Sequence, residues 1–145
     1  MQLKQSADLY TSSFVQMVAY EAARDGFLEE HVKLIRRVYG ERRDAMLEAL
    51  HHYFPPEVTW THPKGGLFLW VTLPPGIDTM KLLDTALRQD VAFVPGDPFY
   101  PGGDTGSHMR LNFSNATLDQ IREGIRRLSI AVAHELEHCA AGVTV

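Results

Sequence analysis

The hydrophobic period of the chain changes at Pro55-Pro56, and this change restricts the folds open to it. Before these prolines, apolar residues recur at helical spacing and form one long stripe from Leu28 to Tyr53. After them, apolar and polar residues alternate with the period of two that is typical of strands. Because each proline fixes φ and lacks a backbone N–H, the helix cannot continue through this pair. The sequence therefore predicts a helical first part and a second part that contains a sheet.

The helical part is expected to hold two helices. Residues 11–13 (TSS) supply N-cap candidates for the first, and Asp25-Gly26 is a stop signal. The second is the long helix over residues 28–53. A long amphipathic helix that leads into a small domain often connects to another domain. We therefore expect residues 1–54 to bridge to a larger domain, and residues 55–145 to form a small domain.

The small domain is expected to combine strands with two helices. Asp78 can cap a short helix, and Thr117 with Gln120 forms a capping box that opens a last helix. Residues 67–73 are almost all apolar, as in a strand buried on both faces. This order predicts an α+β fold, in which helices pack on a small, mainly antiparallel sheet. The expected strands are residues 58–61, 67–73, 91–94 and 109–114.

The composition argues against several classes of protein. The net charge of -4 disfavours a broad phosphate-binding surface, so nucleic acid is not an expected partner. No apolar run is long enough to span a bilayer, and the N-terminus lacks the apolar core of a signal peptide. The single cysteine, Cys139, suits a reducing compartment. These features favour a soluble cytoplasmic protein that has no membrane partner.

Arg110 is the first candidate binding residue. It lies in the expected strand 109–114, where every second residue is apolar and would face the core. Arg110 and Asn112 would then point together to the opposite face. A guanidinium held on a rigid strand suits a carboxylate, because its fork of donors matches two oxygens at once. The alternative is a solvated arginine on the open face of the sheet.

Two glycine-containing segments are further candidates. Gly65-Gly66 can adopt positive φ or let a ligand approach the backbone, and Phe68 follows as a possible pocket wall. Residues 94–99 (VPGDPF) predict a sharp turn at a strand end, which is a frequent place for a ligand-facing loop. The alternatives are a tight strand connection with a core aromatic and an ordinary surface turn.

Metal ligands and a cofactor lysine are not expected in this chain. His134 and His138 are four residues apart but have no third ligand at suitable spacing, so a solvated helix is favoured over a zinc site. The lysines, at positions 4, 33, 64 and 81, have no setting that suggests a Schiff base. No glycine-rich turn opens a helix to hold a phosphate. We therefore expect the chain to hold no catalytic, cofactor-binding or metal-binding residue.

Several segments taken together resemble the class I/II aminotransferases of fold type I, which use pyridoxal phosphate. They are residues 62–71 (HPKGGLFLWV), 91–99 (VAFVPGDPF) and 109–114 (MRLNFS). Residues 4–11 (KQSADLYT) are similar to the 2-aminoadipate and kynurenine aminotransferase branch. The segments occur in order over residues 3–134, which is most of the chain.

The resemblance implies a homodimeric enzyme that passes an amino group from an amino acid to a 2-oxo acid. In the family, the residue matching Arg110 binds the substrate α-carboxylate, and Asn112 would support that face. Gly65-Gly66, Phe68 and the loop 95–99 would flank the substrate. The cofactor lysine of the family lies upstream of the matching segment. We therefore expect this chain to be a C-terminal portion that does not bind pyridoxal phosphate and is inactive alone.

Two alternatives stay open at this point. One is an aminotransferase-like domain joined to a DNA-binding module in a transcription regulator. The other is a free-standing α+β interaction module without a catalytic history. The residues do not indicate which amino acid the substrate would be.

Overall fold

The computed structural model describes residues 10–100, 102 and 107–142, with side chains as far as residue 139. The expected segment 4–11 therefore lies mostly outside the described residues. The chain divides into two compact units, residues 1–38 and 39–145.

The first unit contains the helix α2 (Ser13–Ala23), which confirms the first expected helix. A single 3-10 turn, η1 (Arg24–Gly26), follows it. Asp25 and Gly26 have φ of 65° and 77°, so the backbone leaves the right-handed helical region at the predicted stop signal. None of the described residues of this unit is buried within the chain.

The long helix α3 (Phe27–Tyr53) confirms the second expected helix within one residue. The division between the two units falls inside it, between Val38 and Tyr39. Only its C-terminal half is buried, through Ala45, Met46, Ala49 and Leu50. The last turns of α3 thus belong to the core of the second unit. The expected boundary between residues 54 and 55 stays a prediction about a larger protein.

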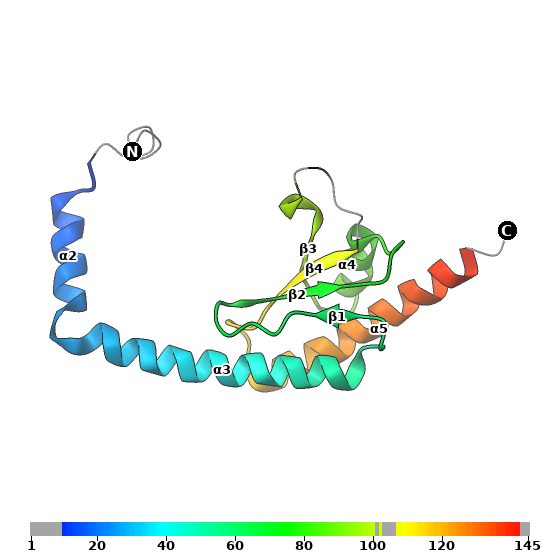
Figure 1. Cartoon of the computed structure of the whole chain (residues 1–145), viewed down its shortest axis with the longest axis horizontal. Coiled ribbons are helices and arrows are strands. Elements are labelled where there is room, and N and C mark those ends of the chain that lie inside the picture. Colours follow the sequence, from blue (N-terminus) through cyan, green and yellow to red (C-terminus); the bar gives the residue numbers. More distant parts are fainter. Residues whose placement is uncertain (1–9, 101, 103–106, 143–145) are drawn as a thin grey trace. The chain divides into compact units, whose positions relative to one another are not determined.

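The second unit is built on a four-stranded antiparallel sheet, which agrees with the expected α+β class (Figure 1). The strand order is β1-β2-β4-β3, and every neighbouring pair is antiparallel. The long central pair aligns Phe68 with Asn112 and Trp70 with Arg110. The strands are β1 (Thr59–Trp60), β2 (Phe68–Thr72), β3 (Val94–Pro95) and β4 (His108–Asn112).

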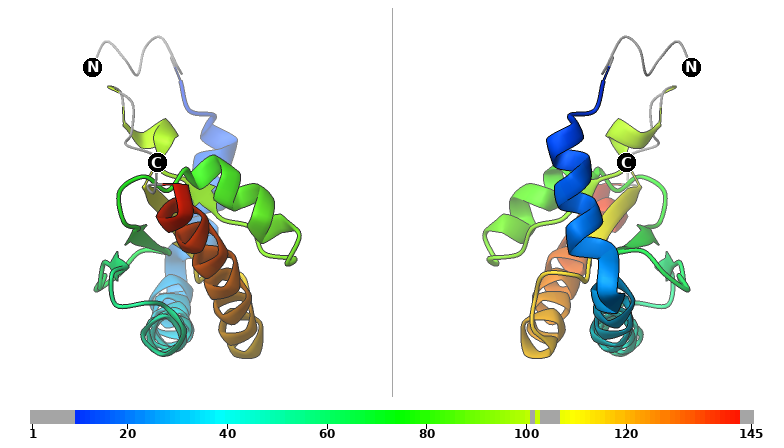
Figure 2. Two further views of the ribbon diagram at one scale, coloured as in Figure 1. Left: turned by 90° about the vertical axis from the view of Figure 1, so that its right-hand side faces the viewer. Right: turned by 90° about the vertical axis from the view of Figure 1, so that its left-hand side faces the viewer.

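The helices cover one face of this sheet. The C-terminal half of α3 and the last helix α5 (Leu118–Gly142) lie on the same side of the strands (Figures 1 and 2). The short helix α4 (Thr79–Leu87) packs against α5. The core is formed by the inward side chains of β2 and β4 and the apolar faces of these helices, including Leu50, Leu69, Val71, Leu82, Met109, Leu111, Leu128 and Val132.

Side-chain caps are present at two of the three predicted helix starts, while Ser12 at the N-cap of α2 makes no capping hydrogen bond through its side chain. The Asp78 side chain accepts hydrogen bonds from the backbone N–H of Met80 at 2.9 Å and of Lys81 at 3.3 Å. In the capping box, the Thr117 N–H donates to Gln120 Oε1 at 2.9 Å, and the Gln120 N–H donates to Thr117 Oγ1 at 3.3 Å. Because these bonds depend on residues three positions apart or fewer, the sequence pattern was sufficient to predict them.

Two strand predictions were wrong in detail. The segment 67–73 is not buried on both faces, because Leu69 and Val71 are buried while Phe68 is exposed and its same-face neighbours are half-buried. The helices cover only one side of the sheet. The predicted strand 91–94 pairs with β4 only from Val94 onward, because the Val91 N–H bonds to the Ala86 carbonyl at the end of α4.

Candidate functional site

Arg110 lies in the middle of β4, on the sheet face that the helices leave open. Its chain neighbours Met109 and Leu111 are 0% and 4% exposed, which confirms the predicted alternation along the strand. Across the sheet, its Cα is paired with Trp70 on β2 and Val94 on β3. The guanidinium is therefore carried by a central strand with a neighbour on each side, which restricts its movement.

Two aromatic rings flank the guanidinium of Arg110. Its Cζ lies 4.2 Å from the ring centroid of Phe68 and 4.7 Å from that of Phe99. Both distances are within the range of a cation–π interaction. Both rings limit the space around the guanidinium, whose N–H groups are all hydrogen-bond donors. We define Arg110, Phe68 and Phe99 as the carboxylate site.

Arg110 has no acidic partner in the described part of the chain. Its Nε is buried, and among the described residues it has no hydrogen-bond acceptor. Leaving a buried donor of a charged group unpaired costs about 1–3 kcal/mol or more. Of the ion pairs formed by the described residues, none involves Arg110. This environment differs from that of a freely solvated arginine, and a carboxylate ligand could bind the terminal N–H groups of the guanidinium.

The turn before β2 positions Phe68. Gly66 has a φ of +80°, which side chains with a Cβ rarely adopt, so the second of the two predicted glycines is required by the backbone. The carbonyl of Pro63 accepts a hydrogen bond from Arg43 Nη1 at 3.3 Å, which ties this turn to α3. The Phe113 N–H donates to the Leu67 carbonyl at 3.1 Å and extends the ladder beside Phe68.

Two arginines of α3 bond to loops of the second unit. Arg42 and Arg43 are both half-buried. Arg42 Nη1 donates to the Ser114 carbonyl, and Arg43 holds the turn at Pro63. The sequence could not show these bonds, because they join α3 to loops 20 and 72 residues away.

The predicted loop 94–99 positions Phe99. The Gly96 N–H donates to the His108 carbonyl at 2.8 Å, so the loop leaves β3 still attached to β4. The 3-10 turn η2 (Asp97–Phe99) then brings Phe99 over Arg110. Further along this loop, residues 101 and 103–106 are outside the described part of the chain. The sequence pattern singled out the loop that contains Phe99 but not the ring of Phe99 itself, and it did not single out Trp70 as a site residue. Both residues are aromatic and lie on the same sheet face as Arg110. The sequence shows that they are aromatic, but only the strand register reveals their place.

Asn112 lies on the same face of β4 as Arg110, and its side chain bonds to the turn that follows the strand. Its Oδ1 accepts hydrogen bonds from the backbone N–H of Ser114 at 2.6 Å and from Ser114 Oγ at 2.8 Å. These bonds form the turn that ends β4, so the side chain supports the local backbone. A contact of Asn112 with substrate stays a prediction, as do the predicted substrate contacts of Gly65-Gly66 and Phe68.

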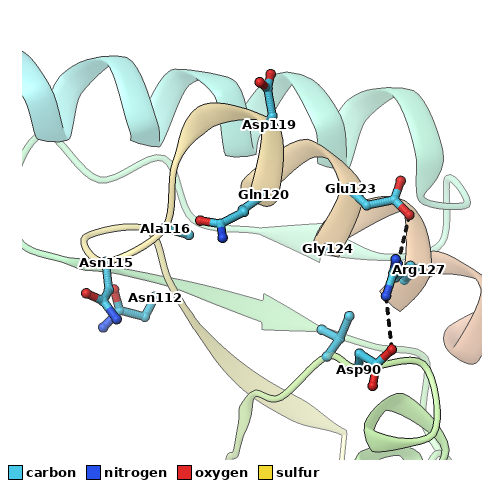
Figure 3. Close-up of a pocket in the computed structure, with 10 residues that line it drawn as sticks. Asp90, Asn112, Asn115, Ala116, Asp119, Gln120, Glu123, Gly124 and Arg127 are labelled. Atoms are coloured by element: carbon cyan, nitrogen blue, oxygen red, sulfur yellow. Dashed lines mark hydrogen bonds and ion pairs between the residues drawn. The ribbon is translucent and has the colours of Figure 1, made fainter.

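A cavity of about 870 Å³, apart from the carboxylate site, lies between the turn after β4, the start of α5 and Asp90. Figure 3 shows Arg127 in this cavity between Glu123 and Asp90. Arg127 Nε donates to Glu123 Oε1 at 2.7 Å, and Arg127 Nη1 donates to Asp90 Oδ2 at 3.3 Å. Asp119 is also paired, with Arg122 at 3.5 Å. Because its charged groups already neutralise one another, this cavity is a weaker candidate for binding a charged ligand than the carboxylate site.

The carboxyl of Glu123, which lines this cavity, has a strongly lowered pKa. Hydrogen bonds from Arg126 and then Arg127 lower the pKa of the Glu123 carboxyl from 4.5 to about 2. A carboxyl whose folded-state pKa lies below its unfolded value stabilises the folded chain above pH 4.5. That contribution is lost as the pH falls from 4.5 toward 2.

Replacing Glu123 with glutamine is therefore expected to flatten the acid dependence of stability in this window. Urea midpoints of the wild type and of Glu123→Gln would be compared at neutral pH and at several acidic values. Since the group is exposed, the difference between the two proteins should shrink when salt is added. An identical pH dependence in both proteins would contradict the assignment.

The described residues do not fit a pyridoxal phosphate group or a metal. The lysine side chains of Lys33 and Lys81 are 69% and 77% exposed and lie beside Glu30 and Asp78, and Lys64 is also exposed. Lys4 lies outside the described residues. At the N-termini of α4 and α5, side-chain caps already accept hydrogen bonds from N–H groups that a phosphate would otherwise use.

His134 and His138 contact each other on α5, with their Nε2 atoms 3.1 Å apart. Within the described residues, no group of three or more His, Cys, Asp or Glu side chains is arranged to hold a metal. None of the helices formed by these residues has the length and apolar character needed to cross a membrane.

Comparison with known proteins places this geometry in a family. The sequence model of the family "Aminotransferase class I and II" matches residues 2–128. The chain belongs to this family. The aromatic-amino-acid aminotransferase 1 of Thermococcus litoralis is 45% identical over 134 residues, which is 92% of this chain and 32% of that protein. The chain thus spans about a third of the length of the curated relatives that it matches.

Solved aminotransferase structures have the same fold over nearly the whole chain. The kynurenine aminotransferase of Pyrococcus horikoshii is 50% identical, with a TM-score of 0.85 over 92% of this chain and 33% of its own. LysN, the α-aminoadipate aminotransferase of Thermus thermophilus in complex with N-(5'-phosphopyridoxyl)-L-leucine, is 42% identical. Its TM-score is 0.84, over 94% of this chain and 35% of its own. These matches confirm the predicted fold type I and the predicted aminotransferase branch.

Uncharacterized HTH-type transcriptional regulators also match, at 25–34% identity. Because the aminotransferases are more similar, the regulator alternative is not favoured. The free-standing interaction module is not favoured either, because the family covers most of the chain.

Proposed function

We propose that this chain supplies the α-carboxylate site of an aminotransferase, which transfers an amino group from an amino acid to a 2-oxo acid. The observation that carries the proposal is the guanidinium of Arg110, flanked by two rings and left without an acidic partner among the described residues. Amino acids and 2-oxo acids share a carboxylate next to the reacting carbon. One fixed guanidinium can therefore hold both substrates in the same position.

Pyridoxal phosphate is proposed as the cofactor of the full-length protein, and this chain is not proposed to bind it. The relative LysN binds a phosphopyridoxyl amino acid, which supports pyridoxal phosphate as the cofactor of the full-length protein. The described residues of this chain do not fit that group, so its binding is assigned to residues outside the carboxylate site. A homodimer in the cytoplasm is part of the same proposal.

The substrate class is proposed from the relatives that this chain matches. Their names specify aromatic amino acids, 2-aminoadipate and kynurenine. The aromatic rings beside Arg110, those of Phe68 and Phe99, are compatible with large donors. We therefore infer a donor with a side chain larger than that of alanine.

The test is an amino-transfer assay of the full-length protein. The protein would be incubated with pyridoxal phosphate, a 2-oxo acid and one of the donors phenylalanine, 2-aminoadipate, kynurenine or alanine. The new amino acid would be followed by chromatography. We expect transfer from at least one of the large donors and slower transfer from alanine. If no donor reacted and the protein instead bound a specific duplex DNA, the regulator alternative would replace this proposal.

A further inference from the structure

The ring of Phe99 contacts the ring of Trp70. The two centroids are 5.5 Å apart and the ring planes meet at 87°, so the contact is edge to face. Phe99 is 45% exposed and lies in a turn of only three residues, η2. Trp70 therefore packs against the ring of Phe99, which in turn contacts Arg110.

Trp70 is itself held in place on its other side. The His108 ring stacks on it with centroids 5.9 Å apart and planes at 29°, and Tyr100 lies 6.1 Å away. Tyr100 and His108 stack on each other at 5.4 Å, and His108 Nδ1 lies 3.2 Å from Thr72 Oγ1. The rings form a continuous series on the open sheet face, which ends at the guanidinium.

We propose that Trp70 is a positioning residue of the carboxylate site, which holds Phe99 so that the Arg110 guanidinium is confined between Phe99 and Phe68. Trp70 does so through the edge-to-face contact and not by touching the substrate. The proposal rests on the function proposed above, because it takes the ligand of Arg110 to be a carboxylate. A confined guanidinium loses less conformational freedom when a carboxylate binds, so the affinity for the substrate rises.

Replacing Trp70 with leucine in the full-length protein tests this proposal. Because an aromatic pair contributes modestly, the KM for both the amino acid and the 2-oxo acid is expected to rise by about threefold to tenfold. The kcat should change by less than about twofold, since the reacting atoms are not touched. Trp70→Phe keeps an aromatic edge toward Phe99 and is expected to restore most of the KM.

Trp60 offers a matched control on the same sheet. It lies on the edge strand β1 and contacts Phe54 edge to face at 6.4 Å, away from Arg110. Trp60→Leu makes the same chemical change and is expected to lower the urea midpoint without raising the KM. If Trp60→Leu raised the KM as much as Trp70→Leu, the effect would be a general loss of sheet stability and the proposal would be overturned.

A double-mutant cycle tests whether Trp70 acts through Phe99. The single variant Phe99→Leu and the double variant with Trp70→Leu added should have equal KM values. Once the Phe99 ring is absent, Trp70 has no ring left to position, so its removal should have no further effect. Additive effects of the two changes would show that Trp70 acts independently of Phe99, which contradicts the proposal.

Hydrogen exchange of the Arg110 Nε–H gives a measure that needs no enzymatic activity. In protein labelled with 15N-arginine, this proton should exchange slowly because Nε is buried, and faster in Trp70→Leu. Faster exchange in a protein that transfers no amino group would support the positioning role and refute the proposed function. An unchanged exchange rate in Trp70→Leu would overturn the positioning role whatever the activity.

Discussion

Replacing Arg110 with glutamine in the full-length protein is expected to lower kcat/KM by on the order of 10² to 10³. Removing one partner of a buried ion pair costs about 3–5 kcal/mol, and each 1.4 kcal/mol corresponds to roughly a factor of ten. The guanidinium is the only charged donor that the described residues place between Phe68 and Phe99, so no neighbour can replace it. Steady-state kinetics with both an amino acid and a 2-oxo acid would measure the loss.

Two further variants make this result specific. Arg110→Lys keeps the positive charge but loses the planar fork, so it should recover only part of the lost kcat/KM. Arg88→Gln removes an exposed arginine at the end of α4 and should leave the kinetics unchanged. The assignment would be wrong if Arg110→Gln behaved like Arg88→Gln.

The loss at Arg110 should be separable from a loss of folding. Because Nε makes no hydrogen bond to a described residue, removing it breaks none, and mainly the two ring contacts are lost. The free energy of unfolding of Arg110→Gln is expected to fall by about 1 kcal/mol or less. A urea denaturation curve close to that of the wild type would attribute the kinetic effect to binding.

Replacing Leu50 with alanine is expected to lower the free energy of unfolding of this chain by about 2–5 kcal/mol. Leu50 is 0% exposed and lies in the C-terminal half of α3, against the sheet and α5. Domains of this size are stable by about 5–15 kcal/mol, so the change removes a large part of the total. Urea denaturation followed by circular dichroism would measure it.

The control lies on the same helix. Leu34 is 47% exposed in the first unit, so Leu34→Ala makes the same change without opening a cavity in the described core. It is expected to alter the free energy of unfolding by less than about 0.5 kcal/mol. Equal losses from the two variants would contradict the division of α3 between Val38 and Tyr39.

The elements that could be predicted from the sequence are those whose interactions are local. The two opening helices, the stop at Asp25-Gly26 and the caps at Asp78 and Thr117 all depend on residues a few positions apart. The alternation along β4 is also local, and it was sufficient to predict that Arg110 lies on the face opposite the core. The resemblance of short segments was sufficient to recognise the family, which the comparisons confirm.

What the tertiary structure decided depends on pairs of residues far apart in the chain. The register of β2 against β4 places Trp70 beside Arg110, and the turn after β3 brings Phe99 over it, which no local period encodes. The burial of only one face of β2 depends on where the helices α3 and α5 pack, and the late start of strand pairing in residues 91–94 depends on the end of α4. Local sequence therefore determined which residues could face a ligand. Long-range packing determined which of these residues come into contact. The reason is that strand register and helix placement minimise the free energy of the whole unit rather than of any one segment.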